Sequence, residues 1–137
     1  MQAQTRALRG DLAGARAFGD TAQIEFALRQ KEVPDDAQSY MFRALGLAYA
    51  GRGAEAIAEA DKGITKSRLD VGFNGMYHRL LRARVLAMSG AQDRAVTELR
   101  ALVDKPFYVT RAWLRIDPTF DMLRGNASFK QLVGGAE

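Results

Sequence analysis

The chain of 137 residues has the length of one domain, and a composition of 47% hydrophobic and 26% charged residues is ordinary for a globular protein. It has no cysteine, which excludes disulfides and thiolate metal sites, and its single histidine argues against a polyhistidine metal site. No apolar run approaches the roughly 18 residues of a membrane helix, and the first residues lack the apolar segment of a signal peptide. We therefore expect a cytoplasmic protein with no membrane segment and no cofactor.

Helical periodicity runs through the first hundred residues, and no stretch alternates with a period of two. It predicts helices over residues 3–17, 21–32, 36–50, 53–67, 75–89 and 92–104. The expected N-caps are Asp20, Asp35 and Asn74, and Pro34 ends the second of these helices. Residues 68–75 form a linker.

A helix, a glycine turn and a second helix recur along the chain. Three pairs of residues share an offset of 39: Gly51 and Gly90, Ala56 and Ala95, and Glu59 and Glu98. A fainter copy lies upstream, where an offset of 34 relates Ala22 to Ala56. Recurrence of helical pairs near this period is typical of a helical solenoid.

These units resemble tetratricopeptide (TPR) repeats, whose period is about 34 residues. The small residues Ala44 and Ala83 match the first helix of that repeat. The matches to its second helix are Ala22, Ala56 and Ala95, each followed four residues later by Phe26, Ala60 or Leu99. Pro34 matches the closing proline, which Arg68 replaces in the second unit and Pro106 precedes by one residue in the third. The resemblance implies an all-α array of three TPR-like helical hairpins over residues 1–106.

The tail, residues 107–137, does not continue the repeat and is expected to form a compact helical cap on the last hairpin. It predicts helices over residues 109–115, 118–124 and 126–133, with Asp117 and Asn126 as N-caps. The run from Leu114 to Leu132 is similar to the closing segment of large bacterial signalling proteins, in which TPR arrays follow a Ser/Thr kinase, cyclase or winged-helix region. This resemblance implies that the chain is the C-terminal piece of a larger regulator.

The TPR resemblance also implies a concave groove lined by the first helix of each pair. The positions that match its lining are Met41, Leu45, Tyr49, Tyr77, Leu80, Arg84 and Met88. Tyrosine and arginine are enriched at binding hot spots, and methionine adapts its shape to a partner. The alternative is that these side chains belong to the core, or are covered by the tail or the N-terminal helix.

A groove of this kind favours a non-catalytic module that binds a protein or peptide, possibly an acidic one, within a bacterial signalling regulator. The alternative is a dimerisation or regulatory module of a larger kinase or transcription regulator, a homodimer with no peptide ligand of its own. A tight dimer that buries the groove would favour this second function.

Residues 71–92 contain no acidic residue and hold four basic or titratable side chains: His78, Arg79, Arg82 and Arg84. They either attract an acidic peptide or a nucleic acid, or pair with glutamates on neighbouring helices, namely Glu55, Glu59 or Glu98. The pattern disfavours nucleic acid, because no aromatic residues of the kind that stack on bases are interleaved with the basic ones.

Three other features have the residue types of catalytic or phosphate-binding sites, but not their spacing. Gly51-Arg52-Gly53 lacks the length and the lysine of a P-loop. His78 has no nucleophile or orienting partner by motif. Asp117 and Asp121 share a helix face, but a capping role explains Asp117 better. We therefore expect no enzyme activity and no catalytic residue.

Overall fold

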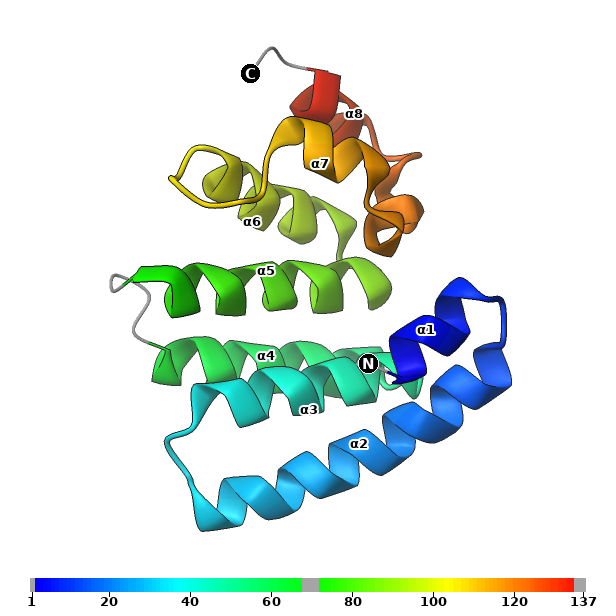
Figure 1. Ribbon diagram of the computed structural model, residues 1–137, viewed down its shortest axis with the longest axis vertical. Helices are drawn as coiled ribbons and strands as arrows, with labels where there is room; N and C mark the ends of the chain where they lie inside the picture. The colour runs from blue at the N-terminus through cyan, green and yellow to red at the C-terminus, as the bar shows by residue number, and fades with distance from the viewer. Residues whose placement is uncertain (1, 68–71, 135–137) are drawn as a thin grey trace.

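The computed structural model describes residues 2–67 and 72–134, and all regular elements in these ranges are helices (Figure 1). In chain order they are α1 (Gln2–Leu8), α2 (Leu12–Glu32), α3 (Ala37–Tyr49), α4 (Gly53–Lys66), α5 (Gly72–Met88), α6 (Gln92–Val103), α7 (Arg111–Ile116), the 3-10 helix η1 (Pro118–Leu123) and α8 (Ala127–Gly134). The predicted all-α class is confirmed, and no strand occurs in the ranges that the structure describes.

Helices α2 to α6 form a row in which each helix packs beside the next (Figure 1). Helix α1 packs on α2 and touches α3, while η1 packs on α5 and α8 packs on α6. Helices α3 and α5, which begin the second and third pairs, also contact each other. The face that α3 and α5 share is therefore bordered by α1 and by η1.

One turn geometry joins the two helices of each pair. Gly10, Gly51 and Gly90 have φ angles of 80°, 81° and 84°. In each turn the residue after the glycine donates its N–H, at 2.9 Å, to the carbonyl oxygen five residues earlier. This is the Schellman helix ending, in which glycine takes the left-handed conformation without steric cost. The described pairs thus share one turn, at spacings of 41 and 39 residues.

The structure corrects the prediction for the first pair. Residues 3–17 and 21–32 do not form two helices separated by an Asp20 cap, because the chain turns at Gly10 and α2 is continuous. Asp11 caps α2 by accepting the N–H of Gly14 at 2.8 Å.

The physical reason for this error is a glycine used for packing. Gly19 lies within α2, where a Cβ atom would come 2.6 Å from the carbonyl oxygen of Gly46 in α3. A Cβ atom on Gly46 would come 2.9 Å from the carbonyl oxygen of Gly19. The two glycines therefore let the backbones of α2 and α3 cross closely.

The upstream copy at an offset of 34 is also wrong. Ala22 and Phe26 lie in the middle of α2, far from its turn. The residues that follow each turn glycine by five are Ala15, Ala56 and Ala95, which are 3%, 0% and 0% exposed. These three buried alanines are the equivalent positions of the described pairs.

Two other caps differ from prediction. The cap of α3 is Asp36, whose oxygen accepts the N–H of Gln38 at 3.2 Å, whereas Asp35 forms an ion pair with Lys66 at 3.0 Å. Asn74 lies inside α5 and does not cap it, because this helix already includes Gly72. Part of the predicted linker, residues 68–71 with Arg68, lies outside the described residues.

The predicted caps of the tail are confirmed. Asp117 accepts the N–H of Thr119 at 2.9 Å and begins η1, and Asn126 accepts the N–H of Phe129 at 3.0 Å and begins α8. The middle tail helix is 3-10 rather than α. Helices α4 and α6 also lie within a residue of their predicted bounds.

The apolar core consists of two clusters that share α5. One joins α3, α4 and α5, with Met41 and Leu47 among its fully buried side chains. The other joins α5 and α6 to the tail, from which it takes Val109, Leu114, Phe120, Leu123, Phe129 and Leu132. Adjacent residues of α5, Leu80 and Leu81, belong to different clusters.

A buried ion pair recurs at the offset of 39 residues. Arg43 of α3 pairs with Glu59 of α4 at 3.0 Å, and Arg82 of α5 pairs with Glu98 of α6. The glutamates are 4% and 8% exposed, and each accepts a further hydrogen bond, from Gln30 or from Arg79 respectively. The repeat in the sequence therefore corresponds to a repeated polar contact between the two helices of a pair.

Candidate functional site

Two adjoining hollows lie on the face that α3 and α5 share. Their volumes are about 440 Å³ and about 520 Å³, and both are lined by Tyr49 and Arg84. We call them together the groove. Its lining comes from α1 (Ala3, Gln4, Ala7, Leu8), α2 (Leu12, Ala15, Arg16, Ala22, Phe26), α3 (Phe42, Leu45, Gly46, Ala48, Tyr49), α5 (Tyr77, Leu81, Arg84, Met88) and η1 (Pro118, Thr119, Asp121, Met122).

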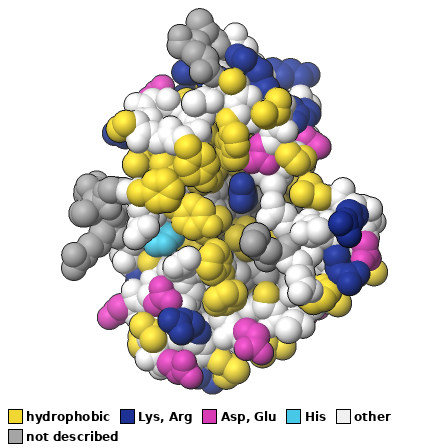
Figure 2. Space-filling model, in the orientation of Figure 1, with side chains coloured by type: hydrophobic (Ala, Val, Ile, Leu, Met, Phe, Trp, Pro, Cys, Tyr) yellow, Lys and Arg dark blue, Asp and Glu magenta, His cyan; other side chains and the backbone are white. Residues whose placement is uncertain are grey.

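The groove is mainly apolar and aromatic. Figure 2 shows a continuous band of hydrophobic side chains on the side of the molecule that faces the viewer in Figure 1. The single histidine, His78, lies at the edge of this band. A hollow of this size and composition, with few polar groups, is typical of a binding site rather than of a smooth protein surface.

The structure brings five of the seven predicted groove residues together. Leu45 and Tyr77 line the first hollow, Met88 lines the second, and Tyr49 and Arg84 line both. All five are half-buried, so part of each side chain is open to the groove.

The other two predicted residues, Met41 and Leu80, do not line the groove. Both are fully buried, Met41 in the cluster of α3, α4 and α5 and Leu80 in the cluster of α5, α6 and the tail. An inner helix packs against neighbours on two sides, so an apolar stripe along it is divided between core and groove. Met41 and Leu80 are on the core side of that division.

The sequence reasoning missed the contributions of α1, α2 and η1. Their positions depend on the turn at Gly10 and on the packing of the tail, which a repeat pattern does not include. Phe42 carried a signal that was available, because it precedes Leu45 by three residues and Tyr49 by seven. This spacing places the three side chains on one helix face.

Arg84 is the central charged side chain of the groove. Its Nη2 atom lies 3.5 Å from Oδ2 of Asp117, and its guanidinium lies 6.0 Å from the ring centre of Phe120. Its Nε atom is buried and has no hydrogen-bond partner. Asp117 uses its other oxygen for the N–H and the hydroxyl of Thr119. The guanidinium therefore keeps hydrogen-bonding capacity for a further acceptor.

The tyrosines beside Arg84 are neutral at physiological pH. Burial raises the pKa of Tyr49, an effect that the positive charge of Arg84 opposes and the negative charge of Asp117 reinforces. Burial likewise raises the pKa of Tyr108, which lies near the same two charges. The tyrosine hydroxyls therefore act as neutral polar groups beside the guanidinium.

Most of the basic stretch in residues 71–92 is neutralised by ion pairs within the molecule. Arg79 and Arg82 both pair with Glu98, as the sequence suggested, and Arg82 also contacts Asp61 at 2.7 Å. The other two glutamates that were considered have different partners: Glu55 pairs with Arg52, and Glu59 pairs with Arg43 and Lys62.

His78 is held against the end of α4. Its Nδ1 atom lies 2.7 Å from the hydroxyl oxygen of Ser67, and the side chain is buried. Burial lowers the pKa of His78, and the nearby charge of Asp36 opposes this shift. The contacts are those of a neutral histidine that links α4 to α5, with no carboxylate in hydrogen-bond contact to orient the ring for catalysis.

The other sequence features have structural roles. Asp117 is a cap, and Asp121 pairs with Arg124 at 2.7 Å. Gly51 forms the turn between α3 and α4, and Arg52 pairs with Glu55. Among the described residues no cluster of His, Cys, Asp or Glu is suited to hold a metal ion, and no helix is both long and apolar enough to cross a bilayer.

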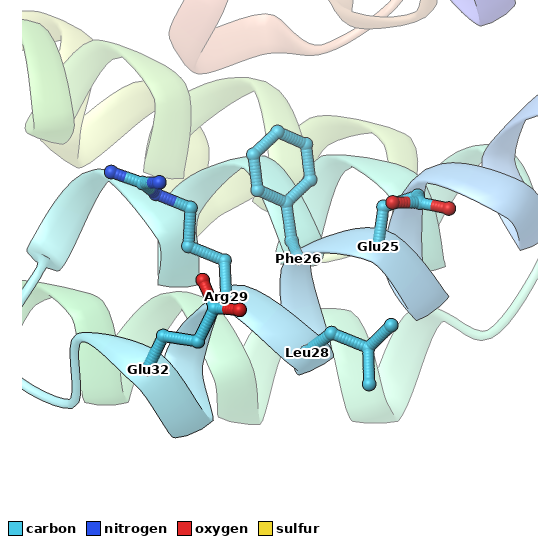
Figure 3. A pocket seen from close by; sticks show the side chains of 5 residues that line it. All are labelled: Glu25, Phe26, Leu28, Arg29 and Glu32. Carbon is cyan, nitrogen blue, oxygen red and sulfur yellow. The ribbon is translucent and has the colours of Figure 1, made fainter.

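A third hollow lies outside the groove, on the outer side of α2 (Figure 3). It is lined by Glu25, Phe26, Leu28, Arg29 and Glu32, all from this one helix. Because a single helix supplies its lining, it is an open depression with no opposing wall.

Comparisons with known proteins give no match. No protein-family model matches the chain, and no match was found among curated proteins or among solved structures. The similarity to TPR repeats therefore remains a prediction, and the candidate function depends on the geometry of the groove.

Proposed function

We propose that the protein is a non-catalytic interaction module that binds a peptide or a partner subunit in the groove. The observation that carries this proposal is the meeting of two mainly apolar hollows at Tyr49 and Arg84. The side chains come from five helical elements, so an elongated ligand can contact several of them at once. Aromatic and arginine side chains at the centre of such a site are the usual binding hot spots.

The charge of the groove favours a ligand segment with an acidic side chain. Arg16 and Arg84 are the basic residues of its lining, and Asp121 is the acidic one. The carboxylate of Asp121 already has an ion-pair partner in Arg124, whereas Arg84 has only a 3.5 Å contact with Asp117. A carboxylate on the ligand would give Arg84 a closer partner than it has within the chain.

We further propose that this module serves a bacterial signalling regulator. This step is supported by the resemblance of the tail, whose Leu114, Leu123 and Phe129 are buried against α5 and α6. The tail would then hold the last hairpin together while the groove remains open. The chain would act by recruiting a partner to the regulator.

Selection from a library of random peptides, with the intact chain as target, tests the proposed function. We expect a family of related peptides that bind reversibly. Tyr49→Ala should weaken their binding by about tenfold or more, since its ring borders both hollows. The matched control is Ile116→Ala, because Ile116 is 76% exposed and lies outside the groove.

Nuclear magnetic resonance locates the bound peptide. Shift changes should concentrate at Leu45, Tyr49 and Tyr77. The proposal is wrong if no peptide is selected above background, or if the shift changes lie elsewhere. Arg84 is a poor first choice for mutation, because its contacts with Asp117 and Phe120 also hold the tail.

A further inference from the structure

The outer face of α2 is open along its whole length. Helix α2 is at the end of the row in Figure 1, and its exposed positions follow one another at helical spacing. We call these positions the α2 face: Leu12, Ala13, Arg16, Ala17, Asp20, Thr21, Ile24, Glu25, Leu28, Arg29 and Glu32. Leu12, Ile24 and Leu28 are 71%, 54% and 51% exposed. The terminal helix of a repeat array normally has a polar outer side, so this apolar content needs an explanation.

Side-chain directions separate the α2 face from the core. In Figure 3, Phe26 points toward the neighbouring helices, where its ring lies 5.3 Å from that of Phe42, whereas Leu28 points away from them. Both sides of α2 therefore have large apolar side chains, and only one side is covered by the rest of the described chain.

The α2 face is also asymmetric in charge. Arg16 lies toward its beginning, and Glu25 and Glu32 lie toward its end, seven residues apart on the same side of the helix. None of these three forms an ion pair within the described part of the chain, whereas most other arginines and acids do. The small residues Ala13 and Ala17 are in the first half, and the large Ile24 and Leu28 are in the second.

We propose that the α2 face binds the α2 face of a second copy of this chain, with the two helices antiparallel about a twofold axis between Asp20 and Thr21. In this arrangement Arg16 of each copy lies opposite Glu25 of the other. Ala17 lies opposite Ile24, and Ala13 lies opposite Leu28. Small residues face large ones and positive charges face negative ones, and the symmetry makes each contact twice.

The size of the contact sets its strength. A helix of 21 residues is about 31 Å long, and the strip that it can bury is about 10 Å wide. Such an interface is at the small end of those that are specific, so we expect a reversible dimer that dissociates in the micromolar range. The groove lies on the other side of α2 and stays accessible, which makes this dimer independent of the proposed peptide binding.

Sedimentation equilibrium of charge-reversed variants tests the pairing. Arg16→Glu and Glu25→Arg should each weaken the dimer by about tenfold, because each places like charges together twice in the interface. The double variant should recover most of the wild-type affinity, since its opposite charges face each other again. Arg100→Glu is the matched control, because Arg100 is exposed on α6, away from the α2 face, and it should leave the dimer unchanged.

Cross-linking tests the orientation, and a chain without cysteines suits it. Thr21→Cys lies beside the twofold axis and should form a disulfide with its own copy under mild oxidation. Leu12→Cys lies at the far end of the antiparallel pair and should not. The proposal is overturned by a chain that stays monomeric at every concentration, by a double variant that does not recover, or by cross-linking at Leu12 that equals that at Thr21. Circular dichroism confirms that each variant remains helical.

Discussion

Removal of a buried glutamate from the repeated ion pair should destabilise the protein far more than removal of an exposed one. Glu98 is 8% exposed and accepts hydrogen bonds from Arg79 and Arg82. Breaking a buried pair by removing one partner costs about 3–5 kcal/mol, because the remaining charge is left without compensation. Arg82 keeps its contact with Asp61, so we expect a value near 3 kcal/mol for Glu98→Ala. Whole domains are stable by only about 5–15 kcal/mol.

Urea denaturation followed by circular dichroism measures this difference in the free energy of unfolding. Glu55→Ala is the control, because its pair with Arg52 is exposed on both sides and such pairs contribute about 0–1 kcal/mol. Glu59→Ala, at the equivalent position of the preceding pair, should resemble Glu98→Ala. A loss for Glu98→Ala no larger than that for Glu55→Ala would refute the reasoning that burial makes these pairs important.

Three other outcomes follow from the fold. Deletion of residues 107–137 removes six buried apolar side chains, each worth roughly 1.5–3 kcal/mol, so the truncated chain should aggregate or melt far lower; an unchanged melting temperature would show that the tail contributes little. Gly90→Ala should cost about 1–2 kcal/mol in thermal unfolding because of the positive φ at Gly90, whereas Gly134→Ala, where a Cβ meets no neighbour, should be nearly neutral. Burial lowers the pKa of His78, so the unfolded chain binds a proton more readily and stability should fall as the pH decreases below about 6.5, by at most about 1.4 kcal/mol per pH unit. In urea titrations His78→Asn should remove this part of the pH dependence, and an identical pH profile for the variant would exclude His78 as its source.

The sequence predicted the parts of the fold that depend on local chemistry. The turns at Gly51 and Gly90 and the caps at Asp117 and Asn126 were predictable, because each depends on a few neighbouring residues. Gly19 was misinterpreted, because a glycine that permits helix crossing and a glycine that permits a turn are the same residue in a sequence. Only the position of α3 beside α2 distinguishes the two uses.

The groove was predictable in part for a related reason. Helical spacing identifies which side chains share a face, and it correctly grouped Leu45 with Tyr49. It does not say where the core ends on that face, which is why Met41 and Leu80 were included although both are buried. Repeat spacing likewise gave no information on α1 or η1, which border the groove from outside the repeat.

The sharing of α5 by both core clusters bears on cooperativity. In a simple repeat array, each unit interacts only with its neighbours, and one end can open while the other stays folded. Here Leu80 and Leu81 support different clusters from adjacent positions of one helix. Loss of either cluster removes one wall of α5 and so weakens the other. The amides of α5 should then exchange with solvent only through opening of the entire chain, while those of α1, which has Ala3 as its one buried residue, exchange through local fraying.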